Sequence, residues 1–454
     1  MENQGTRRCR VVLVPPPFQG HITPMLQLGA ILHSKGFSIT VAHTEFNAPD
    51  SSKHPEFFFL PLSDNVSDID SSFWNLLEVI TAINVNCKEP LQRYLVQMME
   101  KQEPHDQVCC IIYDSIMYFT DAVANHMKLP SIILRTTCAF NFVAWHATPR
   151  LLAEGYIPLP ESLSNELLPG LHPLRSKDLP FTGTGELELL EELRKIRSSA
   201  AVVWNTVDFL EHSSLLQLQQ QYQIPIFSIG PLHKMAPALT TSLLKEDTSC
   251  VAWLDKQAPN SVIYVSMGSL AMVDKKELTE TAWGLANSDQ PFLWVMRAGL
   301  VDGSDQCVDL LPKDLKEKIG ERGHIVKWAP QKEVLAHRAV GGFWSHCGWN
   351  STLESICEGV PMICRPGFSD QKVNSRFLTH IWRVGLEMEN VVERRGIERA
   401  IRRLMVEKEG EEMRQRANEL GQKFKFCVQK GGSSYNSLND LEEFILSQSS
   451  SLPK

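Results

Sequence analysis

Hydrophobic residues gather in short continuous runs along this chain, and amphipathic segments separate the runs. In the first half, strands are predicted at Arg10–Val14, Phe37–Ala42, Phe57–Leu60, Val108–Tyr113, Ser131–Leu134, Ala201–Trp204 and Ile226–Ile229. Runs that are apolar throughout, rather than alternating with polar residues, are typical of parallel strands covered by helices on both faces. The pattern therefore predicts an α/β fold with a parallel sheet.

The first strand is followed by a predicted loop, Pro15–Ile22, and a predicted helix from Pro24 to Lys35. Thr23 is a suitable N-cap, because a threonine hydroxyl can accept a bond from a free backbone N–H. Proline at the first helical position and Gly36 at the exit complete the expected pattern.

After Gly230-Pro231 the periodicity lapses, and Met235–Ser249 is predicted to be an interdomain linker. A second series of strands and helices then begins with "SVIYVSMGSL", a helix near Lys275–Ala286 and "PFLWVM", and continues through "HIVKW", "AVGGFW" and "VPMICR". We expect two Rossmann-like, doubly wound parallel-sheet domains, with the interdomain cleft as the default ligand site.

Composition narrows the function classes. The 454 residues exceed what one hydrophobic core usually serves, and a net charge of −8 disfavours nucleic acid or an anionic membrane as the main partner. No apolar run approaches the roughly 18 residues of a membrane span, and the N-terminus does not resemble a signal peptide. The 11 cysteines include no C-x-x-C pair, so buried free thiols and a cytoplasmic location are expected.

The densest chemistry lies in "WAPQKEVLAHRAVGGFWSHCGWNSTLESICEGVPMICRPGFSDQ", residues Trp328–Gln371. A glycine turn that opens a helix after a strand offers free N–H groups and a helix dipole to an anion. Taken singly, its residues have ordinary explanations: Ser351 and Glu354 form a possible capping box, and His346 and Trp328 are possible core residues. Cys347 lacks a metal-ligand spacing. The combination is improbable for a purely structural segment.

Trp328–Gln371 resembles, without a gap, the 44-residue signature of plant UDP-sugar-dependent glycosyltransferases of small molecules, family 1. "PFQGHITPMLQLGAIL", "WLD" at Trp253–Asp255 and "YVSMGS" at Tyr264–Ser269 extend the resemblance over most of the chain. The most similar branch includes glycosyltransferases of diterpenoid glycosides such as steviol glycosides, of cytokinins and of small organic acids.

The resemblance implies the GT-B fold, with two facing Rossmann-like domains. We expect an acceptor-binding domain over 1–234, a linker over 235–249 and a UDP-sugar-binding domain over 250–434, with a C-terminal helix (435–454) packing back on the first domain. We also expect a monomer.

The resemblance also implies roles for individual residues. Trp328 would stack on uracil while the Ala329 backbone reads its edge, Gln331 would lie near the ribose, and Glu354 would accept from the ribose hydroxyls. The expected diphosphate contacts are His346, Asn350, Ser351 and Ser269, and the expected sugar contacts are Trp349, Asp370 and Gln371. These pairings are chemically suitable, because a base stacks on an aromatic face and a diol donates to a carboxylate.

The acceptor side is far less constrained. Candidates are Phe18, Ile83, Met117, Asn141 and Trp145, with Phe368 from the second domain, and each apolar member is as suitable for an ordinary core. Gly367 stands where many relatives carry a bulkier residue. The glycine would therefore widen the acceptor side of the cleft. Because such loops carry specificity, the sequence does not name the acceptor.

His21 and Asp114 each follow the carboxyl end of a predicted strand, and in a parallel sheet such ends share one edge. Separately, His21 could be a loop histidine bonded to backbone and Asp114 an N-cap. Together they suit a general base, with Asp114 fixing the tautomer of His21 and stabilising its imidazolium. A nearby helix N-terminus should keep His21 neutral. The family pattern places a histidine and an aspartate at these positions.

The chain is therefore interpreted as an inverting glycosyltransferase that moves glucose from UDP-glucose to a hydroxyl or carboxyl of a small plant metabolite. No metal is expected, because the helix dipole, His346 and neutral donors would meet the charge of the leaving diphosphate. A nucleotide-sugar epimerase or a non-catalytic sugar-nucleotide-binding protein is the alternative. A nicotinamide dehydrogenase is disfavoured, since no G-x-G-x-x-G opens either domain.

Overall fold

The computed structural model describes residues 8–66, 76–101, 106–158, 161–180, 187–237, 241–301, 307–388 and 392–450. The chain divides into two compact units. The first comprises the described residues within Met1–Glu154, Gly183–Leu243 and Cys427–Lys454, and the second those within Gly155–Thr182 and Leu244–Phe426. The described residues among 155–182, which lie inside the range expected for the first domain, thus pack with the second unit.

The first unit is built on a seven-stranded parallel sheet in the order β3-β2-β1-β4-β5-β6-β7. Its strands are β1 (Arg8–Val14), β2 (Ser38–Thr44), β3 (Phe58–Leu62), β4 (Asp106–Asp114), β5 (Ser131–Arg135), β6 (Ala201–Trp204) and β7 (Ile226–Ser228). All seven predicted strands are present, with ends shifted by a few residues. The order reverses between β1 and β4, which is the topological switch point of a doubly wound sheet.

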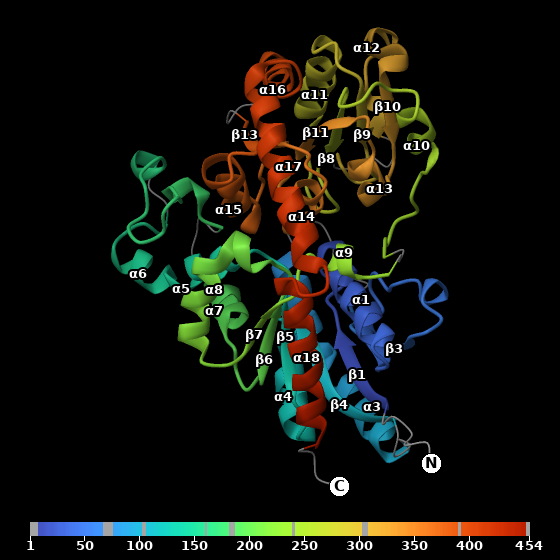
Figure 1. The fold of residues 1–454 in the computed structure, drawn as a ribbon, viewed down its shortest axis with the longest axis vertical. Coiled ribbons are helices and arrows are strands. Elements are labelled where there is room, and N and C mark those ends of the chain that lie inside the picture. Colours follow the sequence, from blue (N-terminus) through green and yellow to red (C-terminus); the bar gives the residue numbers. More distant parts are fainter. Residues whose placement is uncertain are drawn as a thin grey trace. The chain divides into compact units, whose positions relative to one another are not determined.

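Helices cover both faces of this sheet (Figure 1). The helices of this unit are α1 (Gln19–Ser34), α2 (Leu76–Asn86), α3 (Lys88–Lys101), α4 (Phe119–Met127), α5 (Ala139–His146), α6 (Thr148–Ala153), α7 (Leu187–Arg194), α8 (Asp208–Tyr222), α9 (Leu232–Met235) and α18 (Ser433–Ser450). Successive β1 residues face opposite clusters: Val11 and Leu13 pack with α1 and α18, whereas Val12 packs with α2, α3 and α4. This double burial explains the continuous apolar runs.

The C-terminal helix α18 belongs to the first unit, where it contacts β4 and β7. Leu441 and Ile445 lie in the core cluster, and Lys35 of α1 donates to Asn439 at 2.9 Å. The helix begins at Ser433, and the last four residues of the range predicted for it, 451–454, lie outside the described residues.

The second unit contains a six-stranded parallel sheet in the order β10-β9-β8-β11-β12-β13, with its switch point between β8 and β11. The strands are β8 (Val262–Ser266), β9 (Phe292–Val295), β10 (Gly323–Val326), β11 (Val340–Ser345), β12 (Met362–Cys364) and β13 (Gly385–Glu387). Strand β13 was not predicted, because its sequence, Gly-Leu-Glu, contains only one large apolar residue and gives no hydrophobic run. The two sheets confirm the predicted Rossmann-like architecture.

The helices of the second unit are α10 (Ser249–Leu254), α11 (Lys275–Asn287), α12 (Lys313–Ile319), α13 (Gln331–Ala336), α14 (Trp349–Cys357), α15 (Asp370–Arg376), α16 (Arg394–Met405) and α17 (Lys408–Val428). A π-helical turn, Phe377–Ile381, follows α15 directly. Short 3₁₀ turns lie at 51–53 and 161–163, and at 176–178, 307–310 and 320–322.

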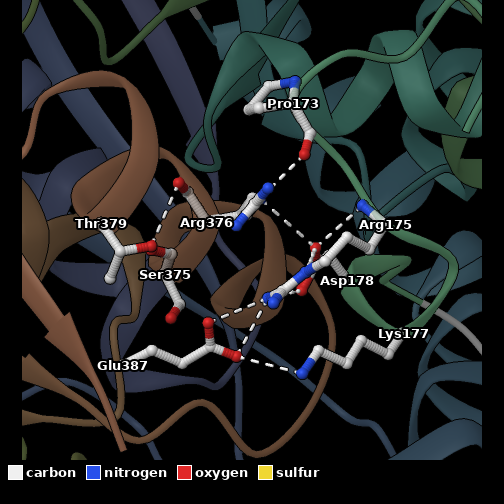
Figure 2. A network of polar contacts seen from close by, with 8 residues as sticks. All are labelled: Pro173, Arg175, Lys177, Asp178, Ser375, Arg376, Thr379 and Glu387. Atoms are coloured by element: carbon white, nitrogen blue, oxygen red, sulfur yellow. Dashed lines mark hydrogen bonds and ion pairs between the residues drawn. The ribbon is translucent and has the colours of Figure 1, made fainter. Parts of the chain in front are cut away.

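Charged side chains attach residues 173–178 to the rest of the second unit (Figure 2). Arg175 donates to Asp178 Oδ2 at 2.7 Å and to Glu387 Oε1 at 2.9 Å, so one guanidinium joins this segment to β13. Arg376, the last residue of α15, donates from Nε to the Pro173 carbonyl at 2.8 Å. The segment therefore supports the carboxyl end of α15.

Two further properties follow from the described residues. Ten cysteines are free thiols and nine of them are buried, which confirms the prediction of buried free thiols. Among the helices of the described chain, none is both long and apolar enough to cross a bilayer.

Candidate active site

His21 and Asp114 meet at the switch point of the first sheet. His21 lies on α1 after β1, Asp114 is the last residue of the neighbouring strand β4, and the Nδ1–Oδ2 distance is 2.8 Å. The Asp114 side chain is 1% exposed and that of His21 is 23% exposed. A carboxylate at this distance favours a proton on Nδ1 and leaves Nε2 as the basic nitrogen.

The local structure around His21 differs from the prediction. Helix α1 begins at Gln19, with Phe18 as N-cap, so His21 lies in its first turn and Thr23 is not the N-cap. Pro24 lies inside the helix, near its amino end. Its missing N–H removes one intrahelical hydrogen bond there. Gly36 does terminate the helix as predicted, with a φ of 96° that favours glycine.

Asp114 is held by a local backbone bond as well as by His21. Its Oδ1 accepts from the Ile116 N–H at 3.0 Å, whereas α4 begins only at Phe119 with Tyr118 as N-cap. The alternative reading of Asp114 as a helix N-cap is therefore wrong. One carboxylate oxygen fixes the turn, and the other faces the imidazole.

Thr136 is a third member of this group that the sequence analysis did not identify. Its hydroxyl lies 2.9 Å from His21 Nδ1 and 3.3 Å from Asp114 Oδ2, and the residue is 6% exposed. It follows β5, which pairs with β4, so it reaches the same edge of the sheet. Its position directly after a strand could have suggested a place in the site, but an isolated threonine after a strand has many ordinary explanations.

At the switch point of the second sheet, the His346 ring lies close to the backbone of two glycines. A Cβ built on Gly268 would lie 2.6 Å from His346 Nε2, and one on Gly348 would lie 2.5 Å from the same atom. The two glycines thus leave room for the ring, and larger residues would displace it. Burial lowers the pKa of His346 to about 4, with a smaller effect from Arg297, so the imidazole is neutral near pH 7.

Helices α13 and α14 bring together Gln331, Ser351 and Glu354. Gln331 Nε2 donates to Ser351 Oγ at 2.9 Å and to Glu354 Oε2 at 2.7 Å. The N-cap of α14 is Gly348, without a side-chain capping bond, so the alternative of a Ser351–Glu354 capping box is wrong. Glu354 is 8% exposed, and the bond from Gln331 helps to satisfy its buried carboxylate.

The remaining predicted donor residues surround these groups. Trp328 is half-buried and its carbonyl accepts from Asp247 N at 2.8 Å, while Ala329 beside it is 3% exposed. Trp349 and Asn350 form the first turn of α14. Ser269 is half-buried in the loop after β8. The donor candidates therefore come from the carboxyl ends of neighbouring strands and from the helices that follow.

Asp370 and Gln371 are the first two residues of α15, after a strained turn at Ser369 with φ of 53°. Gln371 Oε1 accepts from the Gly367 and Phe368 N–H groups at 2.9 and 3.3 Å, so this side chain fixes the preceding loop. Asp370 Oδ2 accepts from Asn374 at 3.1 Å. Figure 2 shows the other end of this helix, where Arg376 contacts residues 173–178.

The acceptor candidates of the first unit are buried. Phe18, Ile83 and Met117 belong to one core cluster, as their alternative explanation anticipated. Asn141 and Trp145 on α5 differ, because the Asn141 amide atoms and Trp145 Nε1 are buried without a hydrogen-bond partner in the described part of the chain. Unsatisfied buried polar groups are costly, so these two are the better ligand-facing candidates.

Glu211 fixes the start of α5. Its carboxylate accepts from the Ala139 and Phe140 N–H groups at 2.9 and 3.1 Å and from the Thr206 hydroxyl at 2.7 Å. Glu211 is 4% exposed and has a non-helical φ of −132° inside α8. A buried carboxylate at the amino end of α5 satisfies free N–H groups there. It thereby fixes the start of α5, the helix that carries Asn141 and Trp145.

Comparison with known proteins identifies the family. A family profile described as UDP-glucoronosyl and UDP-glucosyl transferase matches residues 236–416. UDP-glycosyltransferase 76E1 of Solanum lycopersicum is 54% identical over 448 residues, covering 97% of this chain and 93% of the relative. UDP-glycosyltransferase 76H1 of Stevia rebaudiana is 49% identical over 432 residues, covering 93% and 100%. The chain belongs to the plant family 1 UDP-glycosyltransferases and is a glycosyltransferase of small metabolites.

Solved structures agree with this assignment. The crystal structure of TcCGT1 in complex with UDP has a TM-score of 0.83 and 28% identity, covering 97% of this chain and 100% of that one. The Phytolacca americana UGT2 complex with UDP-2fluoro-glucose and pterostilbene has a TM-score of 0.82 and 26% identity, covering 97% and 99%. The fold is therefore GT-B, as the resemblance implied.

Proposed function

We propose that this glycosyltransferase is inverting, uses UDP-glucose, and transfers glucose to a hydroxyl or carboxyl of a small plant metabolite. The observation that carries the proposal is the 2.8 Å contact between His21 Nδ1 and the buried Asp114 carboxylate. A histidine oriented in this way has its basic Nε2 directed away from the carboxylate, as a general base requires.

The proposed reaction is a single displacement. The acceptor O–H proton moves to His21 Nε2 as the acceptor oxygen forms a bond to the anomeric carbon. The bond between that carbon and the β-phosphate oxygen breaks, and UDP leaves with the electron pair. Asp114 stabilises the imidazolium that forms. Because attack comes from the face opposite UDP, an α-linked donor gives a β-glycoside.

Several features of the second unit support a UDP-sugar donor. The half-buried indole of Trp328 suits a planar base, the Glu354 carboxylate suits a ribose diol, and the amino end of α14 beside neutral His346 suits a diphosphate. We propose that these groups bind without a metal ion. The glucose assignment is supported by Asp370 and Gln371 at the start of α15, and by the UDP-2fluoro-glucose named in the Phytolacca americana structure.

We further propose that Asn141 and Trp145 bind the acceptor, because their buried polar atoms need partners. An aromatic or terpenoid acceptor with a polar substituent would supply both apolar area and hydrogen bonds. A flavonol is a suitable first probe, since a relative 47% identical over 455 residues is named flavonol 3-O-glucosyltransferase UGT76E12 of Arabidopsis thaliana.

The test is a mass-spectrometric screen of the purified protein with UDP-glucose and a panel of flavonols, terpenoid acids and glycosides, cytokinins and hydroxy acids. We expect a mass gain of one hexose on at least one class, a β-anomeric proton coupling by NMR, and full turnover in excess EDTA. Competition with UDP-galactose and UDP-xylose should leave glucose preferred.

Each alternative gives a distinct result. UDP binding without transfer to any acceptor would favour a non-catalytic sugar-nucleotide-binding protein, and conversion of UDP-glucose to another UDP-sugar would favour an epimerase. An α-glycoside product would overturn the inverting mechanism. Magnesium-reversible loss of turnover in EDTA would overturn metal-free binding.

A further inference from the structure

Arg297 joins two loops at the carboxyl edge of the second sheet. It lies two residues beyond the end of β9 and is 8% exposed. Its Nε donates to the Gly268 carbonyl at 3.0 Å, its Nη2 donates to the Ala271 carbonyl, and its Nη1 donates to the Ala298 carbonyl at 3.0 Å. One planar guanidinium thus holds both ends of residues 268–271, the loop after β8.

The loop that Arg297 holds is in contact with the His346 ring. Gly268 has a φ of 70°, and its backbone approaches so closely that an added Cβ would lie 2.6 Å from His346 Cε1. Gly348 backbone approaches the same ring, so the imidazole lies between the two glycines. Ser269, in the middle of the held loop, is the residue next to Gly268. Displacement of this loop would therefore move a hydroxyl and release one side of the imidazole.

We propose that Arg297 is a positioning residue for the diphosphate: it fixes the 268–271 loop, and the loop fixes the His346 ring and the Ser269 hydroxyl. This inference rests on the proposed binding of UDP by the second unit. Arg297 acts through the loop rather than by contact with the ligand. Its positive charge also lowers the pKa of His346, in addition to the larger effect of burial. Arg297 thereby helps to keep the imidazole neutral.

The experiment compares UDP with uridine, which has the same base and ribose but no phosphate. Calorimetric titration of Arg297→Met should show UDP binding weakened about tenfold or more, with uridine affinity changed by less than about twofold. Arg297→Lys should show an intermediate, equally selective loss, because one ammonium cannot hold both carbonyls with the same geometry. In turnover, KM for UDP-glucose should rise more than kcat falls.

Arg414→Met is the matched control. Arg414 also donates to a backbone carbonyl, that of Gly341 at 3.2 Å, but it does so near the amino end of β11, whereas His346 follows the carboxyl end. This variant should bind UDP and uridine as the wild type does. A purely structural effect of removing an arginine that donates to backbone carbonyls would appear in both variants.

Gly268→Ala tests the same contact without altering the arginine, and it serves if Arg297→Met does not fold. The added methyl meets the His346 ring, so UDP binding should again weaken selectively. Parallel losses of UDP and uridine affinity in Arg297→Lys and Gly268→Ala, or unchanged UDP affinity in both, would overturn the inference. Failure of the wild type to bind UDP would instead overturn the proposed function.

Discussion

The second sheet repeats the order of the first six strands of the first sheet, and each sheet places a histidine at its switch point, yet the two histidines have opposite surroundings. His21 contacts a buried carboxylate and a threonine hydroxyl. His346 lies between two glycines, and its pKa is lowered to about 4. In the first unit, the histidine has the partner that a proton acceptor needs, whereas in the second it is held neutral.

With the roles proposed above, this difference lets one architecture support two tasks. A general base must accept a proton, so a carboxylate that stabilises its cation is useful. A neutral imidazole cannot attract a diphosphate by charge, but it can donate a hydrogen bond beside a helix N-terminus. In both units the groups that we propose to face ligands follow the carboxyl ends of the strands, as is usual in a doubly wound sheet. The side chains at the switch point, not the fold, determine the chemistry.

The largest effect should come from removing the proposed base. His21→Ala is expected to reduce turnover of an alcohol acceptor by about 10²–10⁴, or roughly 3–5 kcal/mol of barrier, because general-base assistance is lost. UDP affinity should be unchanged, since the predicted donor residues lie in the other unit. Turnover and calorimetry on the same preparation provide the measurements.

An acidic acceptor provides the control for this prediction. A carboxylic acid is already ionised near pH 7 and needs no base, so His21→Ala should impair its glucosylation much less than that of an alcohol. Near wild-type turnover of alcohols, or loss of UDP binding, would show that His21 is not the base.

The next effect concerns stability and tests the other histidine. The pKa of His346 is about 4 in the folded protein and ordinarily 6.5, so the unfolded chain binds this proton more tightly. The resulting stabilisation is complete above about pH 6.5 and is lost as the pH falls towards 4, by up to about 3 kcal/mol. His346→Gln should therefore show a smaller fall in melting temperature across this range than the wild type.

His126→Gln is the matched control, because His126 is an exposed histidine on α4. Its melting temperature should vary with pH as that of the wild type does. Equal pH dependence in His346→Gln and wild type would mean that the imidazole of His346 is not held neutral by the fold.

A smaller effect is expected on the donor side. Glu354→Ala removes a carboxylate that accepts from Gln331 at 2.7 Å and that we propose to accept from the ribose. Loss of hydrogen bonds to a charged group should raise KM for UDP-glucose by about 10- to 100-fold, with kcat at saturating donor changed only a few-fold. Initial rates at varied donor concentration measure this, with the exposed Glu333→Ala on α13 as control. A fall in kcat with unchanged KM would contradict the assignment.

The sequence predicted the strands and the pairing of His21 with Asp114 better than it predicted where helices begin. All seven strands of the first sheet and five of the six in the second were identifiable, because buried parallel strands are apolar throughout. The pairing of His21 with Asp114 followed from the shared edge of a parallel sheet. The start of α1 was misplaced, because Thr23-Pro24 has the residues of a helix start while the chain becomes helical at Gln19.

Other features depend on tertiary contacts that no local pattern contains. Arg297 follows a strand like many surface arginines, and only the structure shows its bonds to Gly268 and Ala271. Residues 155–182 carry no signal that they pack with the second unit. The acceptor candidates are the residue types of any core, so only the unpartnered polar atoms of Asn141 and Trp145 separate them from it.

The smallest expected effect concerns Thr136, whose hydroxyl contacts both members of the proposed base pair. Thr136→Val keeps the shape and removes the hydroxyl. Loss of roughly 1 kcal/mol of hydrogen bonding to the His21–Asp114 pair should reduce kcat on an alcohol acceptor about fivefold. Thr136→Ser should retain most of the activity.

The neighbouring Thr137 provides the comparison, because its hydroxyl is buried without a hydrogen-bond partner in the described part of the chain. Thr137→Val should therefore keep near wild-type kcat although it makes the same chemical change one residue away. If both valine variants lost activity equally, the effect would be one of packing around β5. If Thr136→Ser were as impaired as Thr136→Val, the methyl group rather than the hydroxyl would be the important part of Thr136. A selective loss in Thr136→Val alone would show that a third polar group orients His21 at the first switch point. At the second switch point, His346 instead lies against the backbone of Gly268 and Gly348.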